Sequence, residues 1–123
     1  MYSVTVEADF SSAHNLRGYK GKCEALHGHN WRVEVEARQK ELDDAGMVMD
    51  FKVLKKRLRA LLETIDHAYL NTIPYFKKVN PTSENIARYL FDALKARIPG
   101  LYRVTVWESE NSHASYFHPS PLE

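Results

Sequence analysis

Hydrophobic and polar residues alternate along three segments of the chain, and a period of two is typical of strands with one buried face. The clearest segments are residues 2–14 and 27–38, and a shorter one covers residues 102–109. Residues 113–118 are predicted to form a last short strand. In the first two segments the apolar residues form one row, which consists of Val4, Val6, Ala8, Phe10, Trp31, Val33, Val35 and Ala37. Residues 15–26 hold two glycines and several polar residues, which indicates a loop between these two strands.

Two other segments repeat apolar residues at helical spacing. The first follows Asp50, which can cap a helix. Its apolar residues are Phe51, Leu54, Leu58, Leu61, Leu62 and Ile65. The second follows the candidate N-cap Thr82 and ends at Pro99-Gly100. Its apolar residues are Ile86, Tyr89, Leu90, Ala93, Leu94 and Ile98. Residues 66–81, between the two helices, are predicted to be irregular.

The order strand, strand, helix, helix, strand, strand predicts an α+β fold. We expect a four-stranded antiparallel sheet with two helices on one face, in a single domain of residues 1–123. Such a sheet has two exposed edges, and oligomerisation is one way of covering them. The pattern therefore favours a homo-oligomer.

Composition narrows the range of partners. The 17 basic and 16 acidic residues give a net charge of +1, which provides no electrostatic reason to expect nucleic acid or an acidic membrane as a partner. No apolar run approaches the ~20 residues that span a bilayer. The N-terminus has no basic stretch followed by an apolar core, and the single cysteine cannot form an internal disulfide. We therefore expect a cytoplasmic protein.

Three histidines occupy the ends of the apolar strand rows. His27 and His29 are two residues apart and share the row of Trp31, and His14 continues the row of the first strand. If these strands pair, the three imidazoles meet, and three neutral imidazoles suit Zn²⁺ with a fourth position open for substrate. The alternative is that these are ordinary polar residues at strand ends, which is the commoner interpretation of a lone histidine.

Cys23 lies four residues before His27, in the loop that leads to the histidines. Lys20 and Lys22 nearby, together with a metal, lower the pKa of such a thiol and make it a candidate base or nucleophile. Two alternatives stay open at this stage. Cys23 is either an inert buried thiol or a fourth zinc ligand, and the latter closes the site and argues against catalysis.

Two further groups are candidates for chemistry. Asp66-His67 follows the first helix, and a carboxylate that orients the ring makes His67 a candidate general acid or base. Glu108 ends the row of Val104 and Val106, and a partly buried carboxylate there can accept two parallel N–H groups from a heterocycle. The alternatives are a surface pair and a solvated strand end.

Six motifs in order carry a resemblance to a known family. They are Phe10-Ser11-Ser12-Ala13-His14, Cys23-Glu24-Ala25-Leu26-His27-Gly28-His29-Asn30, Asp50-Phe51, Asp66-His67-Ala68-Tyr69-Leu70-Asn71, Asn80-Pro81-Thr82-Ser83-Glu84-Asn85 and Trp107-Glu108-Ser109. Over nearly its whole length the chain resembles the 6-pyruvoyl-tetrahydropterin synthase family. The three-residue gap between Cys23 and His27 resembles the bacterial branch, the 6-carboxy-5,6,7,8-tetrahydropterin synthases of queuosine biosynthesis, whereas the animal branch has a longer gap.

The resemblance implies a fold, an assembly and a set of roles. The fold is the tunnelling fold, assembled as a trimer or a dimer of trimers with sites at subunit interfaces. Zinc sits on the three histidines, and Cys23 is the proton-abstracting base. Asp66 and His67 complete a proton relay, contributed by a neighbouring subunit. The residues implied in pterin binding are Glu108, Thr82 and Ser83.

The resemblance also implies a reaction. The substrate is 7,8-dihydroneopterin triphosphate, and the products are 6-carboxy-5,6,7,8-tetrahydropterin, acetaldehyde and triphosphate. Glu24 leaves the product open, since some family members use a glutamate near this position and release a hydroxymethyl pterin. A pyruvoyl-forming activity is the other alternative within the family. In a different class, a non-catalytic zinc- or pterin-binding module uses Cys23 as a ligand.

Overall fold

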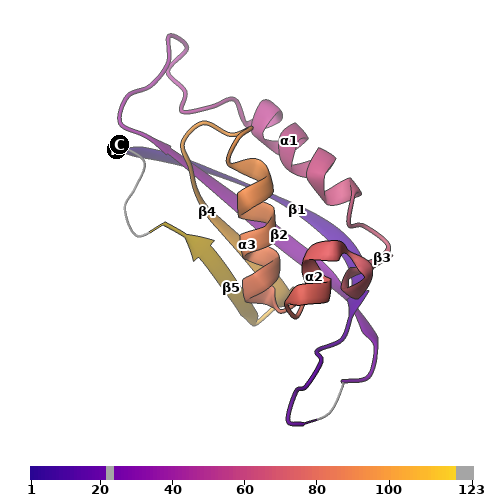
Figure 1. Cartoon of the computed structure of the whole chain (residues 1–123). Coiled ribbons are helices and arrows are strands. Elements are labelled where there is room, and N and C mark those ends of the chain that lie inside the picture. The colour runs from indigo at the N-terminus through magenta and orange to yellow at the C-terminus, as the bar shows by residue number, and fades with distance from the viewer. Residues whose placement is uncertain (22–23, 119–123) are drawn as a thin grey trace.

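The computed structural model describes residues 1–21 and 24–118. In chain order its elements are β1 (Tyr2–His14), β2 (His27–Gln39), α1 (Phe51–Glu63), β3 (Ala68–Tyr69), the 3₁₀ helix η1 (Leu70–Thr72), α2 (Pro74–Lys78), α3 (Ser83–Leu94), β4 (Leu101–Ser109) and β5 (Ser112–Phe117). The strands form one sheet in the order β3-β1-β2-β4-β5 (Figure 1). The predicted α+β architecture is confirmed.

The prediction of a four-stranded, wholly antiparallel sheet is wrong. A fifth strand, β3, pairs in parallel with Ser12 and Ala13 of β1. With two residues, β3 is too short to show an alternating pattern, and it forms because the main chain of His67 donates to Ser11. The same segment, predicted to be irregular, also contains η1 and the five-residue α2. Elements this short carry no measurable period.

The long antiparallel pair of β1 and β2 organises the molecule. The two strands pair from Tyr2–Gln39 to His14–His27 without a break. The apolar residues of β1 therefore lie directly opposite the apolar residues of β2. β2 is central, between β1 and β4, and Trp31, Val33 and Val35 are fully buried. The row predicted from alternation is therefore the sheet's contribution to the core.

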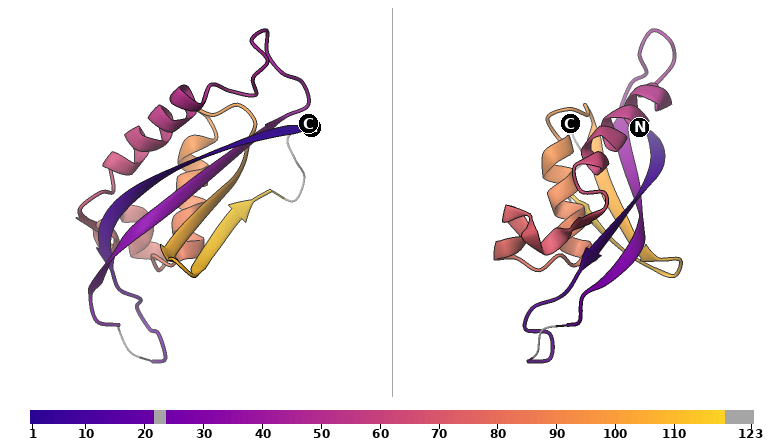
Figure 2. Two further views of the ribbon diagram at one scale, coloured as in Figure 1. Left: turned by 180° about the vertical axis from the view of Figure 1, so that it is seen from behind. Right: turned by 90° about the vertical axis from the view of Figure 1, so that its right-hand side faces the viewer.

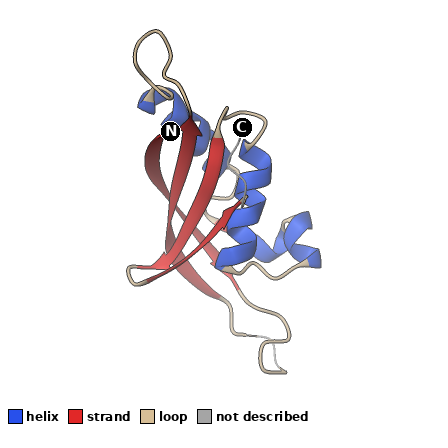
Figure 3. Ribbon diagram, turned by 90° about the vertical axis from the view of Figure 1, so that its left-hand side faces the viewer, coloured by secondary structure: helices blue, strands red, loops and turns tan. Residues whose placement is uncertain are grey.

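The helices lie on one face of this sheet, and the opposite face is bare (Figures 2 and 3). Helix α1 buries Leu54, Leu58 and Leu62 against the sheet. Both predicted caps are confirmed: Asp50 accepts from the main-chain N–H of Lys52, and Thr82 from that of Asn85. None of the described helices combines the length and the apolar character needed to cross a bilayer.

Candidate active site

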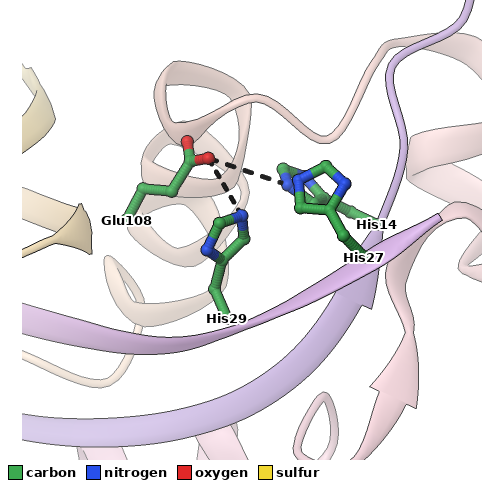
Figure 4. A group of neighbouring side chains, drawn as sticks. All are labelled: His14, His27, His29 and Glu108. Atoms are coloured by element: carbon green, nitrogen blue, oxygen red, sulfur yellow. Dashed lines mark ion pairs between the residues drawn. The ribbon is translucent and has the colours of Figure 1, made fainter. Parts of the chain in front are cut away.

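The fold brings the three predicted histidines together with a carboxylate. His14 and His27 are the last paired residues of β1 and β2, and His29 is one step back on the same row. Glu108 reaches them from β4 (Figure 4). One ligand atom from each of these four side chains lies within 4.8 Å of every other. The three histidines therefore lie together, as their positions on the alternating rows of the two strands predict.

Hydrogen bonds to main-chain carbonyls fix two of the rings. The Nδ1–H of His14 donates to the carbonyl of Pro81 over 2.8 Å, and that of His27 to the carbonyl of Ala25 over 2.9 Å. With the proton held on Nδ1, the Nε2 atom of each ring keeps a free lone pair. Metal-binding histidines are oriented in this way by a partner on the other ring nitrogen.

Two ring nitrogens in the cluster are buried and make no hydrogen bond to any described residue. These are Nε2 of His14 and Nε2 of His29. A buried polar atom without a partner carries a desolvation cost unless something else coordinates it. Burial also lowers the pKa of His29, and the neighbouring histidines add to this, although Glu108 opposes it. A lowered pKa keeps the ring neutral, which is the form that binds metal.

Glu108 connects the histidine cluster to helix α3. Its Oε1 lies 3.0 Å from Nε2 of His29, outside hydrogen-bond alignment, and 3.9 Å from Nε2 of His14. Its Oε2 accepts a 3.3 Å hydrogen bond from the hydroxyl of Ser83. The resemblance assigns Glu108 to the pterin, and its closeness to the histidines was not predicted from the sequence. The sequence did contain a signal for this closeness. Glu108 alternates with Val104 and Val106 along its strand, and these valines lie on the same face of the sheet as the histidines.

Helix α3 begins at this cluster, as the predicted roles of Thr82 and Ser83 require. Pro81, the residue before the N-cap, holds His14, and Ser83 in the first turn holds Glu108. The hydroxyl of Thr82 is engaged in the cap itself, where it accepts from the main chain of Asn85 over 3.1 Å. Thr82 thus fixes the helix end that carries Ser83. Contact of either residue with a pterin stays a prediction.

The Asp66–His67 pair forms, but away from the histidine cluster. Nδ1 of His67 lies 3.0 Å from Oδ2 of Asp66, whose other oxygen accepts from the main chain of Ser11. This main-chain hydrogen bond is the main cause of a lowered pKa for Asp66. The side chain of His67 is 82% exposed, and the residue has a φ of +52°, in the left-handed region.

The surroundings of His67 place it on the bare side of the sheet. The residues that line a shallow hollow with it are Ser11, Ser12, Ala13, Gly28, His29, Asn30 and Ala68. Four of them, Ser11, Ala13, Gly28 and Asn30, alternate with the clustered histidines along β1 and β2. Successive residues of a strand point to opposite faces. Within a single copy of the chain, Asp66 and His67 are not among the side chains whose ligand atoms converge at the histidine cluster.

The loop between β1 and β2 is described only in part. Cys23, the predicted base, and Lys22 lie outside the described residues. Glu24 is half-buried, and its Oε1 lies 3.9 Å from Nδ1 of His27. The guanidinium of Arg17 donates to the carbonyls of Phe76 and Val79 at the end of α2.

The arrangement fits a divalent metal ion. Three neutral imidazoles, two of them oriented from behind, are the ligand set of an open zinc site. Glu108 adds a carboxylate oxygen at the same point. The four side chains can therefore bind a metal ion.

Comparison with known proteins places the chain in a family. The family model for 6-pyruvoyl tetrahydropterin synthase matches residues 3–119. A 6-carboxy-5,6,7,8-tetrahydropterin synthase from Synechocystis is 42% identical, with 99% of each chain covered. The human 6-pyruvoyl tetrahydrobiopterin synthase is 40% identical over 86% of this chain and 77% of its own. The structure of the Caenorhabditis elegans 6-pyruvoyl tetrahydropterin synthase superposes with a TM-score of 0.79 at 32% identity, covering 96% of this chain and 97% of that one. The chain therefore belongs to the 6-pyruvoyl tetrahydropterin synthase family and is an enzyme.

Proposed function

We propose that this enzyme is a 6-carboxy-5,6,7,8-tetrahydropterin synthase. It binds Zn²⁺ through His14, His27 and His29 and converts 7,8-dihydroneopterin triphosphate to the 6-carboxy pterin, acetaldehyde and triphosphate. The observation that carries the proposal is the cluster of three imidazoles, two of which have a buried Nε2 atom without a hydrogen bond to any described residue. The Synechocystis relative of that name supports the choice of product. On this proposal the enzyme catalyses a step of queuosine biosynthesis in the cytoplasm.

Each residue of the site has a role that its contacts support. Zinc, when bound, supplies Lewis-acid polarisation of the oxygens on the substrate side chain. Glu108 accepts N–H groups of the pterin, and Ser83 fixes the orientation of that carboxylate. Cys23 removes the proton from the adjacent carbon. His67, whose Nδ1 is held by Asp66, offers Nε2 for returning a proton.

A complete site on this proposal requires a second copy of the chain. The sheet has open edges at both ends, since β3 covers only Ser12 and Ala13 of β1, and β5 is the last strand. One copy's β5 can pair with the next copy's β1, and head-to-tail contacts of this kind close into rings. A trimer, or two stacked trimers, then brings the exposed His67 of one copy to a neighbour's histidine cluster.

Product analysis tests the reaction. Zinc-loaded protein is incubated with 7,8-dihydroneopterin triphosphate, and the pterin and acetaldehyde are identified by mass spectrometry. The 6-carboxy pterin with acetaldehyde is the expected result. A pyruvoyl or a hydroxymethyl pterin would replace the proposal with a sister activity, and the second product would point to Glu24.

A C23A variant separates this enzyme from a zinc- or pterin-binding module that has no activity. If Cys23 is the base, the variant retains its metal and forms no product. If Cys23 is a structural ligand, the variant loses its metal. Metal content by elemental analysis, measured alongside product formation, distinguishes the two.

A further inference from the structure

Beyond His14 the chain leaves the sheet, and side chains take over the pairing of its main chain. Asn71 bonds Asn15 in both directions: its Oδ1 accepts from the main-chain N–H over 3.0 Å, and its Nδ2 donates to the carbonyl over 2.8 Å. Asn80 does the same to Arg17, over 2.9 Å in each direction. Asn15 and Arg17 are alternate residues, so the two asparagine amides occupy the place of a neighbouring strand.

The residue between them is held from another direction. The main-chain N–H of Leu16 donates to Oε1 of Glu24 over 3.1 Å, and its carbonyl accepts from the main chain of Glu24 over 2.8 Å. We call residues 15–17 the loop stem. Each main-chain N–H and carbonyl group of the loop stem is therefore hydrogen-bonded to Asn71, Asn80 or Glu24. These bonds join the two ends of the β1–β2 loop to each other and to the segment before α3.

The same short segment also supports the histidine cluster. Asn80 precedes Pro81, whose carbonyl orients His14, and its own carbonyl accepts from the side chain of Asn85 over 2.9 Å. Asn71 is 8% exposed and follows the Asp66–His67 pair by four residues. A shift of either asparagine thus moves the loop stem relative to the cluster.

We propose that Asn71, Asn80 and Glu24 are positioning residues of the active site. Together they fix where the β1–β2 loop, which carries Cys23 in the sequence, leaves the sheet beside the histidine cluster. The inference rests on the proposed function in one respect, which is that Cys23 acts on substrate. It assigns Glu24 a hydrogen-bonding role at the loop stem, and not the role of a proton-abstracting base.

Hydrogen exchange tests the geometry without using activity. We expect N80A to raise the exchange rate of the Arg17 amide, and N71A that of the Asn15 amide, at least about tenfold each. Metal content is expected to stay unchanged in both variants. N111A, a change in the β4–β5 turn, is the matched control and is expected to leave both amides as they are. Unchanged exchange in N71A and N80A would overturn the inference.

Kinetics test whether the geometry matters for the reaction. Misplacement of a reacting group by about 1 Å can cost about a hundredfold in rate. We expect kcat of N80A and N71A to fall about tenfold or more with KM little changed, while N111A equals the wild type. Fast exchange together with a wild-type kcat would overturn the positioning role and leave the proposed function standing. If the wild type forms no product, the proposed function is wrong. The positioning role is then tested by the alkylation rate of the single thiol, which we expect to differ between N80A and N111A.

E24Q separates positioning from base chemistry and retains an acceptor for the N–H of Leu16. A positioning Glu24 predicts that E24Q keeps kcat within about threefold of the wild type while E24A loses about tenfold or more. Loss of activity in E24Q equal to that in E24A, with slow exchange of the Leu16 amide preserved in E24Q, would show that the carboxylate itself is needed and would overturn the assignment.

Discussion

The histidine cluster and the Asp66–His67 pair are two parts of one proposed site, but the chain builds them differently. The cluster sits at the ends of paired strands, with His14 only 2% exposed and its ring held by Pro81. The pair lies at a bend beside the open part of the sheet, with His67 82% exposed and in the left-handed region. One part is finished within a single chain, and the other is presented to the outside.

The cluster and the pair therefore depend on different features of the structure. The strand register sets the cluster, so it exists wherever the chain folds. A left-handed φ is uncommon for a residue other than glycine and persists where the surroundings require it, often at functional sites. Here Asp66 and the main chain of Ser11 hold His67 at the surface, so under the proposed function the role of the pair depends on a neighbouring copy.

Loss of a cluster histidine has the largest expected effect. H29A removes one of the three imidazoles, and we expect the metal affinity to fall by more than the roughly 10- to 100-fold typical of outer-shell changes, with product formation abolished. Metal content after dialysis, measured by elemental analysis, checks this. N30A, the next residue and on the opposite face, is the control and should keep its metal. Full metal content in H29A would show that the cluster is not the metal site.

Substitution of the exposed histidine is expected to have a smaller effect of another kind. H67A should keep its metal and lose about 10²- to 10⁴-fold in kcat, which is the usual contribution of an acid–base group. If the pair serves a neighbouring copy, refolding inactive H29A and H67A together restores part of the activity, because mixed rings contain sites with both parts intact. Recovery to no more than the sum of the two separate variants would show that each chain serves its own site.

The sequence predicts the histidine cluster better than it predicts the contacts between distant segments. Parity alone placed His14, His27 and His29 on one face, because a strand has only two faces and the apolar rows identify the buried one. The caps at Asp50 and Thr82 were predictable for a similar reason, since each precedes a helical repeat. Local rules of this kind need no knowledge of the rest of the fold.

Long-range contacts were not predictable in this way. The strand β3 arises from main-chain bonds to β1 across more than fifty residues, and nothing in its two residues indicates it. The Ser83–Glu108 bond and the asparagine pairs to Asn15 and Arg17 also join distant segments. The motifs that carry the resemblance include Asn71, Asn80, Ser83 and Glu108, but a motif does not indicate which distant residue each of them contacts.

Helices α1 and α3 both begin with an N-cap residue, but only α3 begins at the candidate active site. T82A and D50A each remove an N-cap, and each should lower the free energy of unfolding by about 1 kcal/mol. Only T82A is expected to lower kcat as well, since α3 begins with Ser83 at the cluster whereas α1 carries no predicted site residue. Urea unfolding and steady-state kinetics of both variants check this. Equal kcat values would mean that the start of α3 does not position Glu108.

The smallest expected effect concerns the charge on Asp66. Mainly because the main chain of Ser11 donates to this carboxylate, its pKa in the folded state lies below the ordinary value of 3.8. The folded state therefore holds the proton less tightly than the unfolded chain does, so the stability from this charge is present above the unfolded pKa and is lost as the pH falls through the folded one. D66N keeps an acceptor for Ser11 and removes the charge. We expect the wild type to be slightly more stable than D66N in urea at pH 7 and the difference to vanish well below pH 4. A difference that stays constant over this range would show that packing, and not the charge that orients His67, accounts for the contribution of Asp66.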